Sequence, residues 1–357
     1  MIDLSPGELE LSVLDGFARV LRDAETQGWR REGGGCRLDD GLWRRLLDLT
    51  PVMPEVEGQG LSFLTLALIA DRLGAELKGL LLIDHLAGVR ALTGAAESGD
   101  ASAPAALRQI EAQGGVVGLA PRAGALDPRT PPLSLSGAIA DWIIVFDAAG
   151  ARFAAQSPSR RGEVVGNLAD LPVQVLEPAE GWAELQGGPA AARMLAAEHR
   201  TLVAAAIGGM ARRAMELATA YAKERFQFGQ AIGSFQAIAH GLADAKLHAD
   251  GIELLSQEAA WARNAAPERF ELLSQMAFAH AAHAGAAAVK FAMHVFGGYG
   301  AMPDFPVQAY FRTVRAVSLA VGDCREARRA VGRVVIQAPP ETPFALSASP
   351  ALEVAGG

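Results

Sequence analysis

The sequence predicts a mainly α-helical α+β protein. We expect an N-terminal helical domain (1–110), a small middle β-domain (111–180), a C-terminal four-helix bundle (181–338) and a flexible tail (339–357). Three observations support this order. Apolar residues recur at helical spacing near both ends, short β-branched runs alternate with turn residues between them, and alanine is dense in the C-terminal part. Strands do not alternate with helices, so a Rossmann nucleotide site is not indicated.

The first domain is expected to contain helices separated by glycine-rich breaks. Residues 6–27 carry apolar side chains at helical spacing, and Gly33–Gly35 interrupts the pattern. A second apolar helix, Ser62–Leu73, is expected to end at Gly74, because glycine favours helix termination. Residues 95–105 are small and polar, which indicates a linker or a frayed helix end.

The middle and C-terminal domains differ in their periodicity. Between residues 114 and 180, short apolar runs are punctuated by proline and glycine, which is typical of strands. Farther on, long alanine-rich segments predict helices that pack closely, since alanine favours helices and lets them approach. Their apolar faces also predict an oligomer interface. The expected helices are Ala190–Lys223, Ser234–Arg263, Pro267–Val295, Val307–Leu319 and Asp323–Val335.

Composition excludes several classes of function. The formal charge is −8, and nucleic-acid binding needs a basic surface instead. Apolar runs fall short of the ~20 residues that span a bilayer. With no secretory signal and only Cys36 and Cys324, we expect a reduced, cytoplasmic compartment. His280 and His283 share a helix face, but no carboxylate stands at matching spacing, so we expect no metal.

Two loops carry the functional signal. In the first, KERFQFGQAIGSFQ, Arg225 lies beside two phenylalanines, and an arginine fork suits a pyrophosphate. The alternative is an ordinary helix connection with Phe228 and Phe235 in the core. The second loop is Phe296–Gly300, whose glycines allow a ligand to approach the backbone closely. A plain helix C-cap is its alternative.

Together the loops resemble the C-terminal domain of the acyl-CoA dehydrogenases. The resemblance covers about 187–335 through KERFQFGQAIGSFQ and HVFGGYGAMPDFPVQAYFRTVRA, with a fainter match at LWRRLLDLTPVMPEVEGQG. It implies FAD as cofactor, reached across a subunit interface by Arg225 and approached by a glycine turn. The cofactor-binding residues that the resemblance implies are Arg225, Gln227, Phe228, Gln236, His294, Gly297, Gly298 and Gly300.

The chain departs from the family at the catalytic base, a glutamate that removes the substrate α-proton. Its usual position is Val321 here, and its alternative position, directly before Arg200, is His199. Glu198 is one residue away and should point elsewhere, since one residue turns a helix by ~100°. His199 or Asp323 could substitute as base. We therefore assign no catalytic residue to this chain.

The flavin loop of the middle domain is also altered. Leu119–Leu126 keeps the family's proline, alanine and glycine, but apolar residues replace its hydroxyl and carboxylate positions. Residues that act in trans are thus kept and those that act in cis are lost. This resembles the shortened, base-less subunit of α2β2 steroid side-chain acyl-CoA dehydrogenases, whose catalytic partner binds most of the acyl-CoA. The alternatives are a self-sufficient homotetrameric flavoenzyme with an unusual base and a flavin-free scaffold or regulatory subunit.

Overall fold

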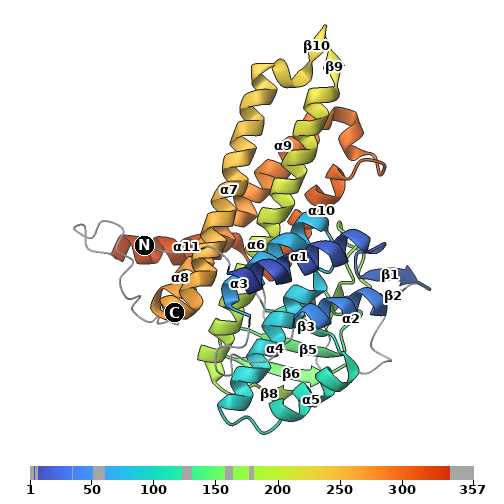
Figure 1. Cartoon of the computed structure of the whole chain (residues 1–357). Helices are drawn as coiled ribbons and strands as arrows, with labels where there is room; N and C mark the ends of the chain where they lie inside the picture. Colours follow the sequence, from blue (N-terminus) through green and yellow to red (C-terminus); the bar gives the residue numbers. More distant parts are fainter. Residues whose placement is uncertain are drawn as a thin grey trace.

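The computed structural model describes residues 4, 7–33, 35–50, 61–122, 131–156, 164–176 and 181–337. N-terminal helices and small sheets form a broad base, from which long helices rise to a free end (Figure 1). Helical, β and helical segments follow one another along the chain, which confirms the predicted fold class. The predicted tail, 339–357, lies outside the described residues. The domain limits remain our division of the chain.

The N-terminal part holds more helix than expected. Gly74 does not end the second apolar helix but lies inside it. Residues 95–105, expected to be a linker or a frayed helix end, comprise the end of one helix, a short connection and the start of the next. The helix before them was missed because its residues 81–89 are buried all round, which removes the amphipathic period. The elements are α1 (Glu8–Asp23), β1 (Trp29–Glu32), β2 (Gly35–Leu38), α2 (Asp40–Leu49), α3 (Phe63–Glu76), α4 (Leu81–Glu97) and α5 (Ala103–Gln113).

The middle part forms a small mixed sheet. Its strand order is β3-β5-β6-β8, with β3 parallel to β5 and the other neighbours antiparallel. Its two parallel strands are almost wholly apolar, and α4 packs so closely on β3 that a Cβ at Gly88 would overlap Val117. A separate pair joins β4 and β7. The strands are β3 (Val117–Pro121), β4 (Leu133–Ser134), β5 (Trp142–Phe146), β6 (Ala151–Ala155), β7 (Gln174–Val175) and β8 (Ala183–Glu184).

The C-terminal part is the helical bundle that the alanine-rich segments predicted. The third expected helix is interrupted by one π-helical turn, η3, between α8 and α9. None of the described helices combines the length and apolar character that a bilayer span requires. The helices are α6 (Gly188–Glu224), α7 (Gln236–Ala265), α8 (Pro267–His280), η3 (Ala281–Gly285), α9 (Ala286–Phe296), α10 (Val307–Val321) and α11 (Cys324–Gln337).

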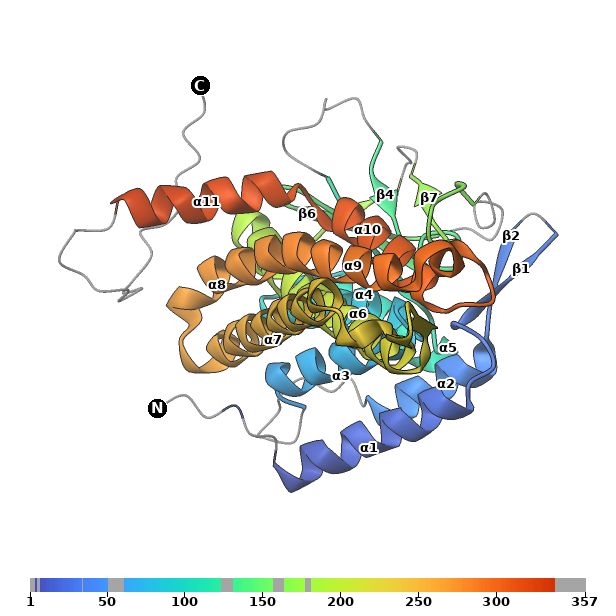
Figure 2. The same cartoon turned by 90° about the horizontal axis from the view of Figure 1, so that it is seen from above.

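The closest crossing between the N-terminal helices and the bundle is that of α3 with α6. Viewed from above, α3 lies beside α6 and α7 (Figure 2). A Cβ at Gly74 would overlap the backbone carbonyl of Ala206, and a Cβ at Gly209 would overlap that of Asp71. Two glycines therefore let α3 and α6 touch through their backbones, and the apolar core runs without a break from α1 to α10.

Candidate functional site

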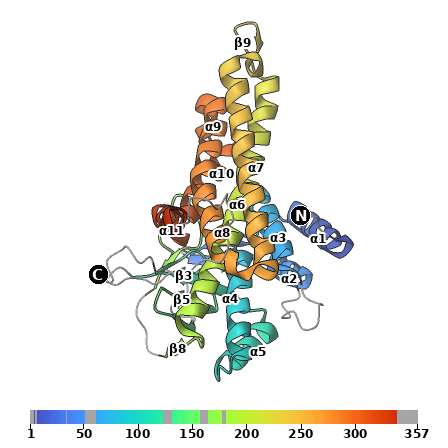
Figure 3. The same ribbon diagram turned by 90° about the vertical axis from the view of Figure 1, so that its left-hand side faces the viewer.

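The first loop is a β-hairpin at the free end of the bundle (Figure 3). After α6, β9 (Phe226–Gln227) pairs with β10 (Gln230–Ala231), and Phe228 and Gly229 form the turn with φ of 54° and 83°. Positive φ at both turn residues suits the right-handed twist of a hairpin, but it is strained for phenylalanine. Phe228 is 92% exposed. Its ring forms a T-shaped pair with the ring of Phe235, with 6.1 Å between centroids. Phe228 is therefore not a core residue. This excludes, for Phe228, the alternative that the two phenylalanines of the loop are buried in the core.

The second loop lies at the end of α9. Gly297 has φ of 58° and opens the 3₁₀ turn η4 (Gly297–Ala301). An added Cβ would meet nothing within 4 Å at Gly297 or Gly298, so both present open backbone. At Gly300, in contrast, a Cβ would lie 2.7 Å from the carbonyl oxygen of Met293. The glycines thus serve three needs: conformation, an open face and close packing.

The fold brings these two loops together. The Tyr221 ring, at the end of α6, stacks on Phe296 at 4.3 Å between centroids. The Arg225 guanidinium lies over the Tyr299 ring, with Cζ 5.8 Å from its centroid. No ion pair joins Arg225 to a carboxylate in the part of the chain that is described. An exposed guanidinium beside open glycine backbone is a suitable place for an anionic group.

The remaining predicted residues are exposed. Gln227 donates from Nε2 to the Phe226 carbonyl at 2.7 Å. Gln236 is the first residue of α7, and His294 lies near the end of α9 with its ring 5.9 Å from Phe291. These side chains are free to contact a ligand, although they do not form one enclosed cavity.

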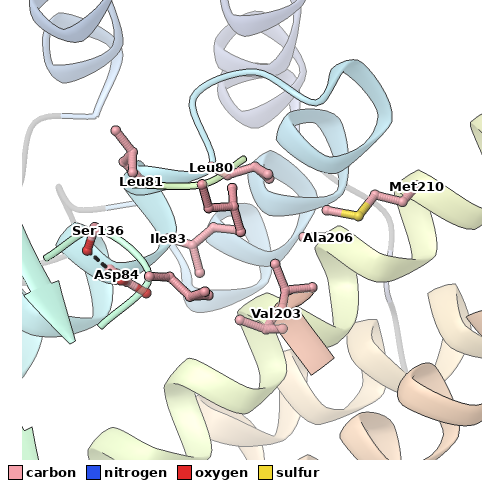
Figure 4. Close-up of a pocket in the computed structure, with 11 residues that line it drawn as sticks. Leu80, Leu81, Ile83, Asp84, Ser136, Val203, Ala206 and Met210 are labelled. Carbon is pink, nitrogen blue, oxygen red and sulfur yellow. Dashed lines mark hydrogen bonds between the residues drawn. The ribbon is translucent and has the colours of Figure 1, made fainter. Parts of the chain in front are cut away.

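A pocket opens beside the middle of α6, where the three parts of the chain meet (Figure 4). Apolar side chains of α4, α6 and α10 line it, including Ile83, Val203 and Val317. Among the described residues that line it, Asp84 and Ser136 are the polar ones. Its cavity volume is about 30 Å³. That volume suits a water molecule, whereas small-molecule sites commonly measure ~300–1,000 Å³.

Both base positions lie near this pocket. Val321, buried at the end of α10, is one turn beyond the pocket-lining Val317. His199 is buried, and its Nε2 lies 2.9 Å from Oδ1 of Asp84. The Oγ of Ser136 donates to Oδ2 of the same carboxylate at 2.7 Å. His199 is therefore engaged by the protein itself.

The other two carboxylates near the base positions are also occupied. As expected, Glu198 points away from His199, and it forms ion pairs with Arg90 at 3.0 Å and Arg263 at 2.6 Å. Asp323 accepts from the backbone N–H of Arg325 at 2.8 Å, and this bond holds the pKa of Asp323 below its usual value. Asp323 thus caps the start of α11.

Two further sequence expectations concern metal and the flavin loop. His280 ends α8 and His283 lies in η3. No cluster of three metal-ligand side chains occurs in the residues described. In the altered flavin loop, Leu119 and Ala120 are buried in β3, and residues 123–126 lie outside the described residues, as do residues 51–60 of the fainter match.

Comparisons with known proteins identify the bundle. Residues 186–336 match the family model described as acyl-CoA dehydrogenase, C-terminal domain. Residues 186–336 form an acyl-CoA dehydrogenase C-terminal domain. The chain is 32% identical over 138 residues to the acyl-CoA dehydrogenase FadE27 of Mycobacterium tuberculosis, covering 37% of each protein. The matches to curated relatives span between 31% and 60% of their lengths.

Solved structures extend the likeness to the whole fold. The ChsE4–ChsE5 complex from Mycobacterium tuberculosis aligns with a TM-score of 0.70 at 21% identity, over 95% of this chain and 100% of that one. A Tcur3481–Tcur3483 steroid ACAD variant aligns with a TM-score of 0.71 at 22% identity, over 92% and 97%. The chain therefore has the acyl-CoA dehydrogenase fold.

Sequence reasoning missed three residues within this acyl-CoA dehydrogenase fold. Tyr299 was visible inside the glycine run, but its contact with Arg225 was not. Asp84 and His85 stand in the apolar first half of α4, which is itself a signal of buried polar contacts. His85 accepts from the backbone N–H of Val117 at 3.3 Å, and burial lowers its pKa to about 4.

Proposed function

We propose that this chain is the base-less subunit of an α2β2 FAD-dependent acyl-CoA dehydrogenase. In this role it supplies flavin contacts in trans to a homologous catalytic partner that binds most of the acyl-CoA. The single observation that carries the proposal is a contrast within the chain. Arg225 is exposed beside an open glycine turn and has no carboxylate partner among the described residues. In contrast, the buried Val321 stands at the base position, near the chain's own pocket.

The free end of the bundle fits a pyrophosphate. The Arg225 fork can donate two parallel hydrogen bonds to phosphate oxygens, and Gly297 and Gly298 leave room for the cofactor to approach their backbone. Phe228 presents its ring on the same hairpin. The chemistry that FAD would supply here is a hydride acceptor for the substrate β-carbon. The residues that we assign to it are Arg225, Gln227, Phe228, Gln236, His294, Gly297, Gly298 and Gly300.

The chain's own pocket supports a division of labour between subunits. Desaturation requires a base at the α-carbon, and loss of such a base commonly lowers the rate ~10²–10⁴-fold. Valine at position 321 cannot accept a proton, and His199 is bonded to Asp84. The small cavity also leaves little room for an acyl chain. We therefore assign proton removal and most substrate contacts to the partner. A steroid side chain as substrate rests on the likeness to the steroid ACAD variant.

Co-expression with a homologous subunit that carries the glutamate tests the proposal. We expect the co-purified complex to hold flavin and to desaturate acyl-CoA, and the chain purified alone to do neither. In the complex, Arg225→Ala should remove most of the flavin, since each charge-assisted bond is worth ~1.5–3 kcal/mol. Arg225→Lys should restore it in part, because an ammonium cannot reproduce the fork.

Arg213→Ala is the matched control for the arginine substitution. Arg213 is half-exposed on the same helix, but its guanidinium pairs with Glu216 at 3.1 Å. Its loss should leave the absorbance ratio of flavin to protein unchanged. Full flavin occupancy in the Arg225→Ala complex would contradict the proposal and reduce Arg225 to a cation at a helix C-terminus, worth ~0.3–1 kcal/mol.

One contact favours a second candidate, the self-sufficient homotetramer. The bond between His199 and Asp84 resembles the pairing that orients a catalytic imidazole. If the lone chain is yellow and active, and His199→Gln abolishes turnover while flavin stays bound, this candidate replaces the first. Absence of flavin even in the complex would instead support a scaffold or regulatory subunit.

A further inference from the structure

An aromatic cluster joins the two loops at the free end of the bundle. Tyr221 stacks on Phe296, and Phe305 lies 5.7 Å from Phe296 and 5.5 Å from Tyr299, measured between ring centroids. The first of these rings belongs to the helix that leads into the hairpin, and the other three belong to the glycine turn and its continuation. Their contacts therefore fix the position of one loop relative to the other.

Arg225 lies at the edge of this cluster. Its backbone is held on both sides, since its N–H donates to the Tyr221 carbonyl at 2.9 Å and its carbonyl accepts from Ile232 at 2.8 Å. Its side chain has one described neighbour of matching chemistry, the Tyr299 ring at 5.8 Å. A guanidinium over an aromatic face is attracted by the negative charge of that face.

The backbone of Tyr299 is fixed by its neighbours. The positive φ of Gly297 starts the turn, the absence of a side chain at Gly300 lets it pack on Met293, and the carbonyl of Tyr299 accepts from Met302 at 3.0 Å. Tyr299 is 43% exposed, and its ring packs against Phe305 at 5.5 Å between centroids. The ring is thus a fixed support on which a long side chain can rest.

We propose that Tyr299 is a positioning residue that holds the Arg225 guanidinium ready for the flavin pyrophosphate. This inference rests on the proposed function. An arginine free in solvent must give up rotamer freedom when it binds a phosphate, which weakens binding. Contact with the Tyr299 ring restricts those rotamers before the cofactor arrives. Tyr299 acts through Arg225 and not by a contact of its own.

FAD titration of the co-purified, flavin-stripped complex measures this effect without turnover. We expect Tyr299→Leu to raise the FAD dissociation constant about fivefold, the order that an exposed cation–π contact provides. Tyr299→Phe should stay within about twofold of the unsubstituted chain, because it keeps the aromatic face. Phe311→Leu is the control, since Arg315 lies over that ring at the same 5.8 Å but on α10. Its dissociation constant should not change.

A double-mutant cycle separates positioning from direct contact. If Tyr299 acts through Arg225, adding Tyr299→Leu to Arg225→Ala should weaken FAD binding no further. Additive effects would show that the ring contacts the cofactor directly and would overturn the inference, as would a Tyr299→Leu complex with unchanged affinity. An Arg225→Ala complex that binds FAD normally would instead refute the proposed function, so the two failures are distinct.

Discussion

At the scale of single residues, Val321 and His199 occupy the two positions at which the family resemblance would place a base. The Val321 side chain has no atom that can accept a proton, and the sequence alone predicts this. His199 keeps a chemically competent ring, but the ring is buried and bonded to Asp84, 115 positions earlier in the chain. Only the fold reveals that bond, since no local pattern joins residues so far apart.

His85 provides a prediction about pH. Its pKa is lowered to about 4 in the folded chain, from an ordinary value of 6.5. The unfolded chain therefore takes up a proton first, so this contribution to stability is complete above pH 6.5 and is lost as the pH falls toward 4. At about 1.36 kcal/mol per pKa unit, the loss between pH 7.5 and 4.5 should be about 2–3 kcal/mol. Urea unfolding at both values measures it.

Two variants isolate the His85 contribution. His85→Gln can still accept from Val117 but does not titrate, so its stability should fall less over the same interval. His240→Gln removes an exposed histidine and should behave like the unsubstituted chain. Equal losses for all three proteins would show that acid destabilises the fold through other groups.

At the scale of elements, the crossing of α3 and α6 determines how the N-terminal helices meet the bundle. Gly209→Ala would place a methyl group against the Asp71 carbonyl, and backbone cannot move aside as a flexible side chain can. We expect a loss of about 2 kcal/mol in the free energy of unfolding, despite alanine's higher helix propensity. Urea unfolding with linear extrapolation gives this quantity.

Gly332→Ala is the matched control for the crossing. That glycine lies in α11, and an added Cβ there would meet nothing within 4 Å. Alanine should stabilise this helix by about 0.5–1 kcal/mol. A Gly209→Ala protein as stable as the unsubstituted chain would mean that the two helices can separate at little cost.

At the scale of the whole molecule, α7 exposes two leucines in the single chain. Leu247 and Leu254, seven residues apart, are 69% and 59% exposed. Leucine side chains are usually buried in folded proteins. We expect the chain, alone or with its partner, to sediment as an oligomer through the face of α7 that carries these leucines. Leu247→Glu with Leu254→Glu should produce smaller species, because two carboxylates cannot be buried unpaired.

A control with the same chemistry lies off this face. Leu319 on α10 is also exposed, and Leu319→Glu should leave the sedimentation coefficient unchanged. If the unsubstituted chain and its complex both sediment as monomers, the predicted interface is wrong. If only the double variant unfolds, circular dichroism of the same samples will show it.

The sequence contained enough information for the order of the three parts, because helical and strand periodicity are local properties. It also placed the two loops at helix ends, because the apolar helical pattern stops where the glycines of each loop begin. The absence of a base at Val321 needed only residue identity. Helix α4 escaped prediction because a helix buried on every side has no amphipathic period.

Contacts between distant segments were decided by the tertiary structure. Arg225 and Tyr299 are 74 positions apart, and they meet because α6 and α9 lie side by side and end at the same level. The same holds for His199 and Asp84, and for the glycines that let α3 reach α6. Such pairings depend on how whole helices pack, and packing is set by shape over the entire core, which no short stretch of sequence encodes.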